Sequence, residues 1–203
     1  AYACVVDGVG VAVEVNAETD FVGKNEKFVD FVKGVAATVA KANPADLDAL
    51  MECKYDGTDM TVTQQQEMVL VIGENIKVRR FARFAENVSV PYVHAGGKIG
   101  VLVNLESDLP AEKVEEIGKD VAMQIAALNP RFWDKSQVGQ DVLDEEKKIM
   151  MVQMENDPKM ASKPEAVRAK IVMGKLNKFY SENCLLQQEF VKDNSMSVEK
   201  YIE

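Results

Sequence analysis

The segment Tyr2-Ala3-Cys4-Val5-Val6-Asp7-Gly8-Val9-Gly10-Val11-Ala12-Val13 returns 90 residues later as Tyr92-Val93-His94-Ala95-Gly96-Gly97-Lys98-Ile99-Gly100-Val101-Leu102-Val103. Both copies consist of two short apolar runs separated by residues that tolerate positive φ, Asp7-Gly8 in the first and Gly96-Gly97 in the second. Each copy therefore predicts a β-hairpin, and the repeat predicts a protein built from two similar halves.

An amphipathic helix is expected after each hairpin, and both helices stop at the same dipeptide. The first ends at Asn43-Pro44 and the second at Asn129-Pro130. Proline cannot continue the helical hydrogen-bond ladder and disfavours helical geometry in the residue before it. The first helix carries its apolar residues at helical spacing, at Phe28, Phe31, Val32, Val35 and Val39.

The connection between hairpin and helix is longer in the first copy. Gly10 and Asn43 are 33 positions apart, whereas Gly100 and Asn129 are 29 apart. The four extra residues fall in or beside Thr19-Asp20-Phe21-Val22, where the second copy has Glu106-Ser107-Asp108-Leu109-Pro110. The pattern leaves two interpretations open: Phe21 probes another protein, or it is a hydrophobic staple folded against its own helix.

A short helix over 62–71 and a strand over 76–84 are expected between the copies. Strict alternation predicts that Ile76, Val78 and every second residue after them face inward. Arg79, Arg80 and Arg83 could form a patch for a partner, but the pattern favours a solvated row that discourages further sheet pairing.

Two long helices follow Asn129-Pro130. They are expected over 141–155 and 165–180, and the connection over 156–164 contains two prolines. The seam is expected at Val142, Leu143, Ile149, Met150 and Met154 on the first helix and at Ala169, Met173, Leu176 and Tyr180 on the second. This coiled-coil hairpin could dock on the parent domain or on a second copy of the chain.

The expected fold class is α+β, with two repeated antiparallel-sheet-plus-helix halves and an inserted antiparallel helical hairpin. The boundaries are expected at 1–87 for the first half, 88–136 for the second half, 137–183 for the hairpin as a candidate dimerisation domain, and 184–203 for a segment returning to the core. Since residue 1 already reads as strand, the chain is expected to be a fragment.

Composition narrows the function classes. The chain has 33 acidic and 24 basic residues and a net charge of -9, which disfavours direct binding to nucleic acid. Cys4, Cys53 and Cys184 are far apart and indicate neither a disulfide set nor a zinc site, which favours a reducing cytoplasm. No membrane span or signal peptide is predicted, because no apolar run of about 18 residues occurs.

No constellation of side chains predicts catalysis. His94 is the single histidine and is expected to be a hydrogen-bonded structural residue. The segment 95–100 resembles a phosphate loop superficially, but it opens a strand where such a loop would open a helix. Glu18 with Asp20 is a weak candidate for a carboxylate site. The sequence therefore predicts no catalytic residue, no metal and no cofactor.

Four segments together are similar to one known family. They are Glu14-Val15-Asn16-Ala17-Glu18-Thr19-Asp20-Phe21-Val22-Gly23-Lys24-Asn25, Ile72-Gly73-Glu74-Asn75-Ile76-Lys77-Val78-Arg79-Arg80, the hairpin Tyr92 to Val103, and Asn129-Pro130. In this order they resemble the elongation factor Ts family of translation elongation factors. The first segment is the most specific, and the resemblance covers most of the chain.

The resemblance implies a function without covalent chemistry. A member of this family would be a guanine-nucleotide exchange factor for the GTPase elongation factor Tu. The loop of Thr19, Asp20, Phe21 and Val22 would enter the GTPase, and the aromatic ring would wedge between helices near the nucleotide and disrupt the magnesium and phosphate site. The resemblance thus favours a wedge over a staple for Phe21.

Three departures from the family limit this reading. The family normally begins with a small helical module like a ubiquitin-associated domain and continues past a segment like 195–203 into a further strand. Gln124 stands where the family commonly has His, so it is only a candidate secondary contact to the partner.

Bacterial cytoplasm is the expected location, with an organelle matrix as the alternative. The competing function is an interaction or dimerisation module that uses the helical hairpin and has no exchange activity.

Overall fold

The computed structural model describes residues 1–69 and 74–203 and has two compact units, 1–126 and 127–203. The predicted α+β class is confirmed, because small antiparallel sheets combine with several helices. The end of the helix expected over 62–71 and the Ile72-Gly73 pair lie outside the described residues.

The first sheet of unit 1 has the strand order β1-β2-β3 and is antiparallel throughout. Its strands are β1 (Tyr2–Val6), β2 (Val9–Asn16) and β3 (Lys77–Phe84). Asp7 and Gly8 form the turn between β1 and β2 with φ of 51° and 81°, so the predicted hairpin is confirmed. Alternate β2 residues Val11, Val13 and Val15 are buried.

Helix α2 (Glu26–Ala42) covers one face of this sheet and supplies much of its core. The Asn25 side chain caps it by accepting a bond of 2.9 Å from the Lys27 amide. It ends at Asn43, which is left-handed at φ 49°, and α5 (Ala111–Leu128) is followed by Asn129 at φ 46°. The predicted stops are confirmed, and both copies use the same αL asparagine before proline. Besides α2, three shorter helices are described between β2 and β3 in the sequence: α1 (Asp20–Gly23), α3 (Leu47–Glu52) and α4 (Val62–Val69).

Tyr55 lies against the middle of α2. Its ring stacks on Phe31 with centroids 5.9 Å apart, and its hydroxyl donates to the carbonyls of Asp30 and Phe31 at 3.1 and 3.3 Å. Burial, and secondarily the charges of Asp30 and Asp56, raise the pKa of Tyr55 to about 12.

This shifted pKa predicts an alkaline loss of stability in unit 1. Folding favours the neutral phenol, so its contribution is complete below the ordinary pKa of 10.0 and is lost as the pH rises towards 12. Hydrogen exchange of α2 amides at pH 9 and pH 11 should show a larger drop in protection in the wild type than in Tyr55→Phe. Tyr180→Phe, in the other unit, should behave as the wild type in α2. Equal drops in all three proteins would contradict the prediction.

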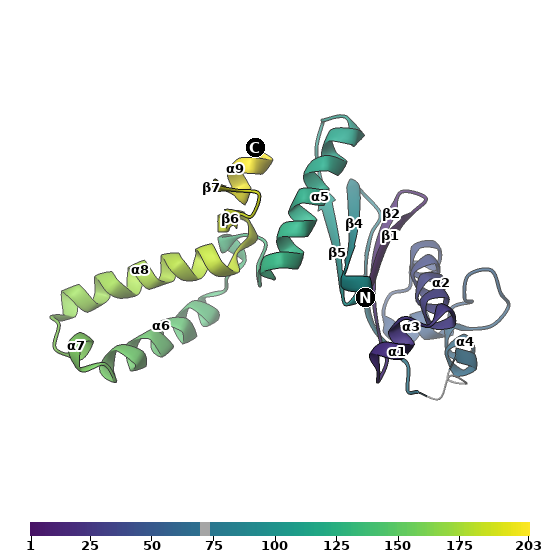
Figure 1. Ribbon diagram of the computed structural model, residues 1–203, viewed down its shortest axis with the longest axis horizontal. Coiled ribbons are helices and arrows are strands. Elements are labelled where there is room, and N and C mark those ends of the chain that lie inside the picture. The colour runs from purple at the N-terminus through teal and green to yellow at the C-terminus, as the bar shows by residue number, and fades with distance from the viewer. Residues whose placement is uncertain (70–73) are drawn as a thin grey trace. The chain divides into compact units, whose positions relative to one another are not determined.

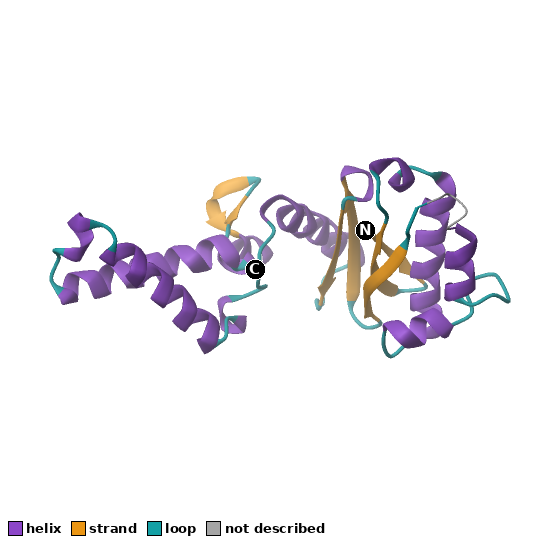
Figure 2. Cartoon of the chain, turned by 90° about the horizontal axis from the view of Figure 1, so that it is seen from below, coloured by secondary structure: helices purple, strands orange, loops and turns teal. Residues whose placement is uncertain are grey.

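The second half of unit 1 contains the second predicted hairpin. It consists of β4 (Val88–His94) and β5 (Ile99–Leu105), joined through a 3-10 turn (Ala95–Gly97) with positive φ at all three residues. Helix α5 (Ala111–Leu128) packs closely on it, since a Cβ on Gly118 would lie 2.5 Å from Val90 Cγ2. Figures 1 and 2 show the resulting layers within the unit, with α2 on the first sheet and α5 on the second hairpin.

The glycines shared by the two repeat copies lie where the hairpins approach each other. A Cβ on Gly10 would lie 2.2 Å from Ser89 Oγ on β4, and one on Gly100 would lie 3.1 Å from Ala1 Cβ beside β1. Each copy therefore uses its glycine to admit the opposite hairpin.

The expected inward face of the strand after Ile76 is wrong beyond Val78. Ile76 and Val78 are buried, but Phe81 and Arg83 are then the partly buried positions, and Ala82 and Phe84 are exposed. The cause is a β-bulge: Glu14 pairs with Arg80 and Val15 with Val78, so Arg79 is an extra residue. One extra residue moves every following side chain to the other face.

Unit 2 contains the predicted helical hairpin, in which α6 (Gln140–Glu155) and α8 (Glu165–Asn183) lie side by side and antiparallel (Figure 1). Short helix α7 (Pro158–Ala161) joins them, and β6 (Glu189–Phe190), β7 (Asp193–Ser197) and α9 (Val198–Ile202) follow, together with 3-10 turns at Lys135–Gln137 and Leu185–Gln187. The hairpin core contains Met150, Leu176, Phe179 and Cys184.

The predicted seam of this hairpin is only partly confirmed. Met150, Met154 and Leu176 are buried, whereas Met173 is 60% exposed and Ile149 is 42% exposed. On α8 the inward stripe consists of partly buried Val172 and buried Leu176 and Phe179, so it shares Leu176 with the expected stripe and lies one position away from Met173 and Tyr180. Apolar residues on both sides of Leu176 allow two stripes, and spacing alone does not choose between them.

Residues 1–69 and 74–203 contain neither a candidate membrane span nor a candidate metal cluster. None of the helices described there is long and apolar enough to cross a membrane. The same residues include no group of three or more His, Cys, Asp or Glu side chains placed to hold a metal ion.

Candidate functional site

Phe21 is the centre of the candidate site. It lies in the one-turn helix α1, shortly after the end of β2, and 88% of its side chain is exposed. Among the large apolar side chains that the structure describes, this is the largest exposed fraction. The ring does not act as a staple against α2.

Val22 occupies the place that a staple would fill. It is 4% exposed and belongs to the core cluster that contains Phe28 and Val32. The resemblance had assigned Val22 to the contact surface together with Thr19, Asp20 and Phe21. In this structure the Val22 side chain anchors α1 to the core, and its part in a contact surface stays a prediction.

Thr19 anchors the other side of Phe21. It stands at the N-cap position of α1, yet its side chain makes no capping bond. Its backbone amide donates to Glu74 Oε2 at 2.9 Å, and its hydroxyl donates to Glu74 Oε1. One carboxylate therefore holds both the backbone and the side chain of the residue that begins α1.

Asp20 has a weaker partner. Its carboxylate lies 3.2 Å from Lys98 Nζ, on the turn between β4 and β5. The two side chains are 79% and 66% exposed, so a pair of this kind contributes about 0–1 kcal/mol. Asp20 can therefore exchange this partner for another at small cost.

Hydrogen bonds close the loop after Phe21. The amide of Lys24 donates to the Phe21 carbonyl at 3.2 Å, and that of Asn25 donates to the Val22 carbonyl at 2.9 Å. Asn25 then caps α2. The Phe21 ring thus projects from a short segment that is held by Thr19 before it and by Val22 after it.

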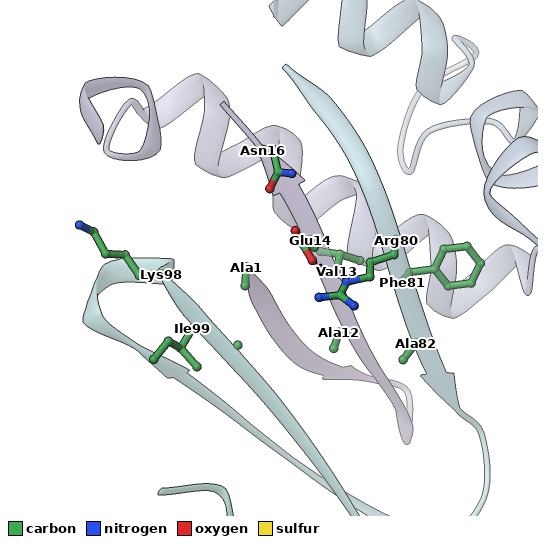
Figure 3. A pocket seen from close by; sticks show the side chains of 11 residues that line it. Ala1, Ala12, Val13, Glu14, Asn16, Arg80, Phe81, Ala82, Lys98 and Ile99 are labelled. Carbon is green, nitrogen blue, oxygen red and sulfur yellow. Dashed lines mark hydrogen bonds and ion pairs between the residues drawn. The ribbon is translucent and has the colours of Figure 1, made fainter. Parts of the chain in front are cut away.

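Unit 1 contains two hollows, and the loop lines one of them. One, of about 620 Å³, is lined by the loop from Val15 to Asp20, by Phe28 and Val32 of α2, and by the turn from Ala95 to Lys98. The other, of about 660 Å³, is shown in Figure 3. Lys98 and Ile99 line it from the second hairpin, and Ala12, Glu14, Arg80 and Ala82 line it from the first sheet.

Glu14 and Arg80, which line the second hollow, are paired with each other. Glu14 accepts bonds of 2.9 Å from Arg79 and 2.5 Å from Arg80, which follow one another at the bulge. The hydrogen bond from Arg79, followed by that from Arg80, lowers the pKa of Glu14. Arg83 donates to the Ala40 carbonyl at 3.0 Å near the end of α2. The three arginines expected to form a solvated row thus also bind groups of neighbouring elements, Glu14 on β2 and the Ala40 carbonyl on α2.

His94 is hydrogen-bonded, as the sequence predicted. Its Nδ1 lies 2.9 Å from the Tyr92 hydroxyl, and the two rings are tilted against each other with centroids 5.8 Å apart. The contact is local to the end of β4.

The predicted secondary contact of Gln124 stays a prediction. Its side chain is fully buried, so it is not available to a partner in this structure. Conversely, sequence reasoning missed Glu74 and Lys98, which hold the loop from 55 and 78 residues away. Glu74 did occur in a segment quoted for the family resemblance, and this was the only signal that could have drawn attention to it.

Comparison with known proteins gives a consistent result. Residues 18–203 match the family model described as Elongation factor TS. Elongation factor Ts of Syntrophotalea carbinolica is 44% identical over 198 residues, which are 96% of this chain and 64% of that protein. The corresponding protein of Trichlorobacter lovleyi is 43% identical over 202 residues, with 96% and 64% coverage, and that of Clostridium kluyveri is 42% identical over 194 residues, with 94% and 62% coverage. The chain spans somewhat less than two thirds of the length of these relatives.

Proposed function

The chain belongs to the elongation factor Ts family, and we propose that it acts in translation elongation as a guanine-nucleotide exchange factor for elongation factor Tu. It makes and breaks no covalent bond in this role. The observation that carries the proposal is the exposure of Phe21 on a segment fixed from both sides. Thr19, Asp20 and Phe21 form the contact surface, and Val22 anchors it.

The mechanism uses the apolar area of one ring. Burying a Phe side chain is worth about 1.5–3 kcal/mol, and this energy is gained only if the partner opens a place for the ring. A place between two helices of a GTPase exists only after those helices have moved. The magnesium ion bound with the nucleotide requires near-ideal octahedral geometry, so a small shift of its ligands weakens the binding of both the ion and the nucleotide.

The exchange factor and GDP are therefore linked through the conformation of the GTPase. The factor binds more tightly to the conformation that holds nucleotide poorly. By reciprocity, the factor weakens nucleotide by the same ratio by which nucleotide weakens the factor. Pre-ordering of the loop by Glu74 and Val22 reduces the entropy lost on binding.

A nucleotide-release assay tests the proposal. Elongation factor Tu from a bacterial relative is loaded with fluorescent GDP, and release into excess unlabelled GDP is followed with and without this chain. We expect the rate to rise with the concentration of the chain and then to saturate. Release at the intrinsic rate at every concentration, from a chain with the expected circular dichroism spectrum, would contradict the proposal.

A second candidate function is an interaction or dimerisation module that acts through the helical hairpin. The observation that favours it is apolar exposure on α6 and α8, where Val152 is 49% and Met173 is 60% exposed. This function predicts that removal of the Phe21 ring leaves partner binding intact, whereas the exchange function predicts weaker binding. The same hairpin, residues 137–183, would be the contact in a homodimer.

We place this activity in the bacterial cytoplasm, because the relatives above are from bacteria and the proposed partner works in translation. The finer division into 1–87, 88–136, 137–183 and 184–203 is likewise a proposal, guided by the internal repeat and by the position of α6 and α8.

A further inference from the structure

We infer that Glu74 is a positioning residue for the Phe21 wedge and that it fixes the direction in which the ring projects. This inference rests on the exchange function proposed above and extends it to a residue outside the loop. Glu74 lies far from Phe21 in the sequence and is partly buried, just before β3.

The geometry around Thr19 supports this role. A threonine at an N-cap position ordinarily accepts a hydrogen bond from an amide in the first turn of its own helix. Thr19 makes no such bond, and its hydroxyl is directed to Glu74 instead. Its amide donates to the other oxygen of the same carboxylate. Two bonds to one group fix both the position and the rotation of the residue, which a single bond would not do.

The second anchor makes the first one effective. Val22 is held in the core by apolar packing, so the segment from Thr19 to Val22 is attached at both ends. Two residues, Asp20 and Phe21, lie between the anchors. If Glu74 is lost, α1 can pivot about Val22, and the ring samples directions that do not fit a preformed cleft.

Lys98 is not expected to have the same importance. It contacts Asp20 through one highly exposed ion pair, which is a weak restraint. Glu74 accepts hydrogen bonds from both the amide and the hydroxyl of Thr19, and its side chain is less exposed than that of Lys98. Glu74 and Lys98 therefore differ in their expected effects. Removing the Glu74 side chain should disturb the position of the Phe21 ring, and removing the Lys98 side chain should disturb it far less.

The first experiment measures order in the loop without any partner. Chymotrypsin cleaves after an accessible Phe only when the surrounding backbone can leave its folded geometry, and mass spectrometry identifies cleavage after Phe21. We expect Glu74→Ala to accelerate this cleavage about tenfold and Glu74→Gln to change it much less. The Gln side chain can accept from the Thr19 amide and donate to the Thr19 hydroxyl, so it preserves the geometry without the charge. Glu67→Ala, which removes an exposed carboxylate on α4, is the matched control and should leave the rate unchanged.

The second experiment measures exchange. Glu74→Ala should lower the saturating rate of GDP release about tenfold, and Glu74→Gln should recover most of the loss. Thr19→Val should fall between them, because it keeps the amide bond and loses the hydroxyl bond, while Thr19→Ser should resemble the wild type. The double variant with Glu74→Ala and Thr19→Val should release GDP no more slowly than Glu74→Ala alone. Both substitutions remove the same hydrogen bond, between the Thr19 hydroxyl and the Glu74 carboxylate, so their effects should not add.

The outcomes separate this inference from the function on which it rests. If the wild type stimulates release and Phe21→Ala does not, but Glu74→Ala matches the wild type in both assays, Glu74 has no positioning role. If the wild type fails to stimulate release, the exchange function is wrong, and cleavage after Phe21 still decides whether Glu74 orders the loop. A general loss of folding in Glu74→Ala would appear as cleavage throughout unit 1 and as failure of Glu74→Gln to recover, which would also overturn the inference.

Discussion

Replacing Phe21 with Ala is expected to lower the efficiency of stimulated GDP release by roughly 10- to 100-fold. The substitution removes most of the apolar area that the partner would bury, about 1.5–3 kcal/mol, and about 1.4 kcal/mol corresponds to a factor of ten. The loss should appear mainly in the saturating rate, because the ring acts on the conformation in which nucleotide is held poorly. Fluorescent GDP release over a range of factor concentrations separates this rate from affinity.

The folded state should tolerate this substitution. Because 88% of the Phe21 side chain is exposed, its loss should change the free energy of unfolding by no more than about 0.5 kcal/mol. Phe21→Trp and Phe21→Leu extend the test, since the first keeps an aromatic ring and the second keeps part of the apolar area. Activity should fall in the order Phe, Leu, Ala.

The internal repeat supplies a matched control. Leu109 is 54% exposed and lies in the segment that replaces the Phe21 loop in the second half of unit 1. Leu109→Ala removes exposed apolar area from an equivalent connection and should leave release unchanged. If Leu109→Ala and Phe21→Ala reduce release equally, the effect is one of general surface change and the wedge mechanism fails.

The sequence was most informative where local chemistry decides the structure. Asp7-Gly8 determined a turn, and Asn43-Pro44 and Asn129-Pro130 determined two helix ends, because positive φ and proline restrict the backbone residue by residue. The exposure of Phe21 was one of two outcomes that the pattern allowed. Either Phe21 or Val22 could extend the apolar spacing of α2 towards the N-terminus, and in the structure Val22 is the one that packs in the core.

Features that depend on a distant partner could not be predicted. The bulge at Arg79 depends on the pairing of β3 with β2, whereas strict alternation within 76–84 carries no information about the opposite strand. The links from Glu74 to Thr19 and from Lys98 to Asp20 join positions 55 and 78 residues apart. Such contacts become visible only when the two hairpins and the loop have been placed in one unit.

The contact between α2 and Tyr55 leads to the largest expected change in stability. Gly34→Ala should reduce the free energy of unfolding of unit 1 by about 1–3 kcal/mol, although glycine in a helix interior is ordinarily about 1 kcal/mol worse than alanine. A Cβ on Gly34 would lie 1.9 Å from the Tyr55 hydroxyl oxygen and 2.0 Å from Cζ. Tyr55 cannot easily retreat, because it stacks on Phe31 and donates to two carbonyls of α2.

Gly174 in α8 is the matched control with the opposite expected sign. A Cβ there would have no heavy atom within 4 Å, so only the helix propensity changes. Gly174→Ala should therefore stabilise unit 2 by about 0.5–1 kcal/mol. Hydrogen exchange with mass spectrometry measures each unit separately, which matters because a single melting curve could mix two transitions.

A double variant shows whether Tyr55 is the cause of the Gly34 effect. Tyr55→Leu removes the atoms that the new methyl group would meet, so Gly34→Ala made in that background should cost much less than in the wild type, or should stabilise. If Gly34→Ala stabilises the wild-type protein as Gly174→Ala does, Tyr55 does not pack on α2 as described. The alkaline loss of stability predicted from the pKa of Tyr55 would then lose its basis as well, since both effects require the same buried hydroxyl beside Phe31.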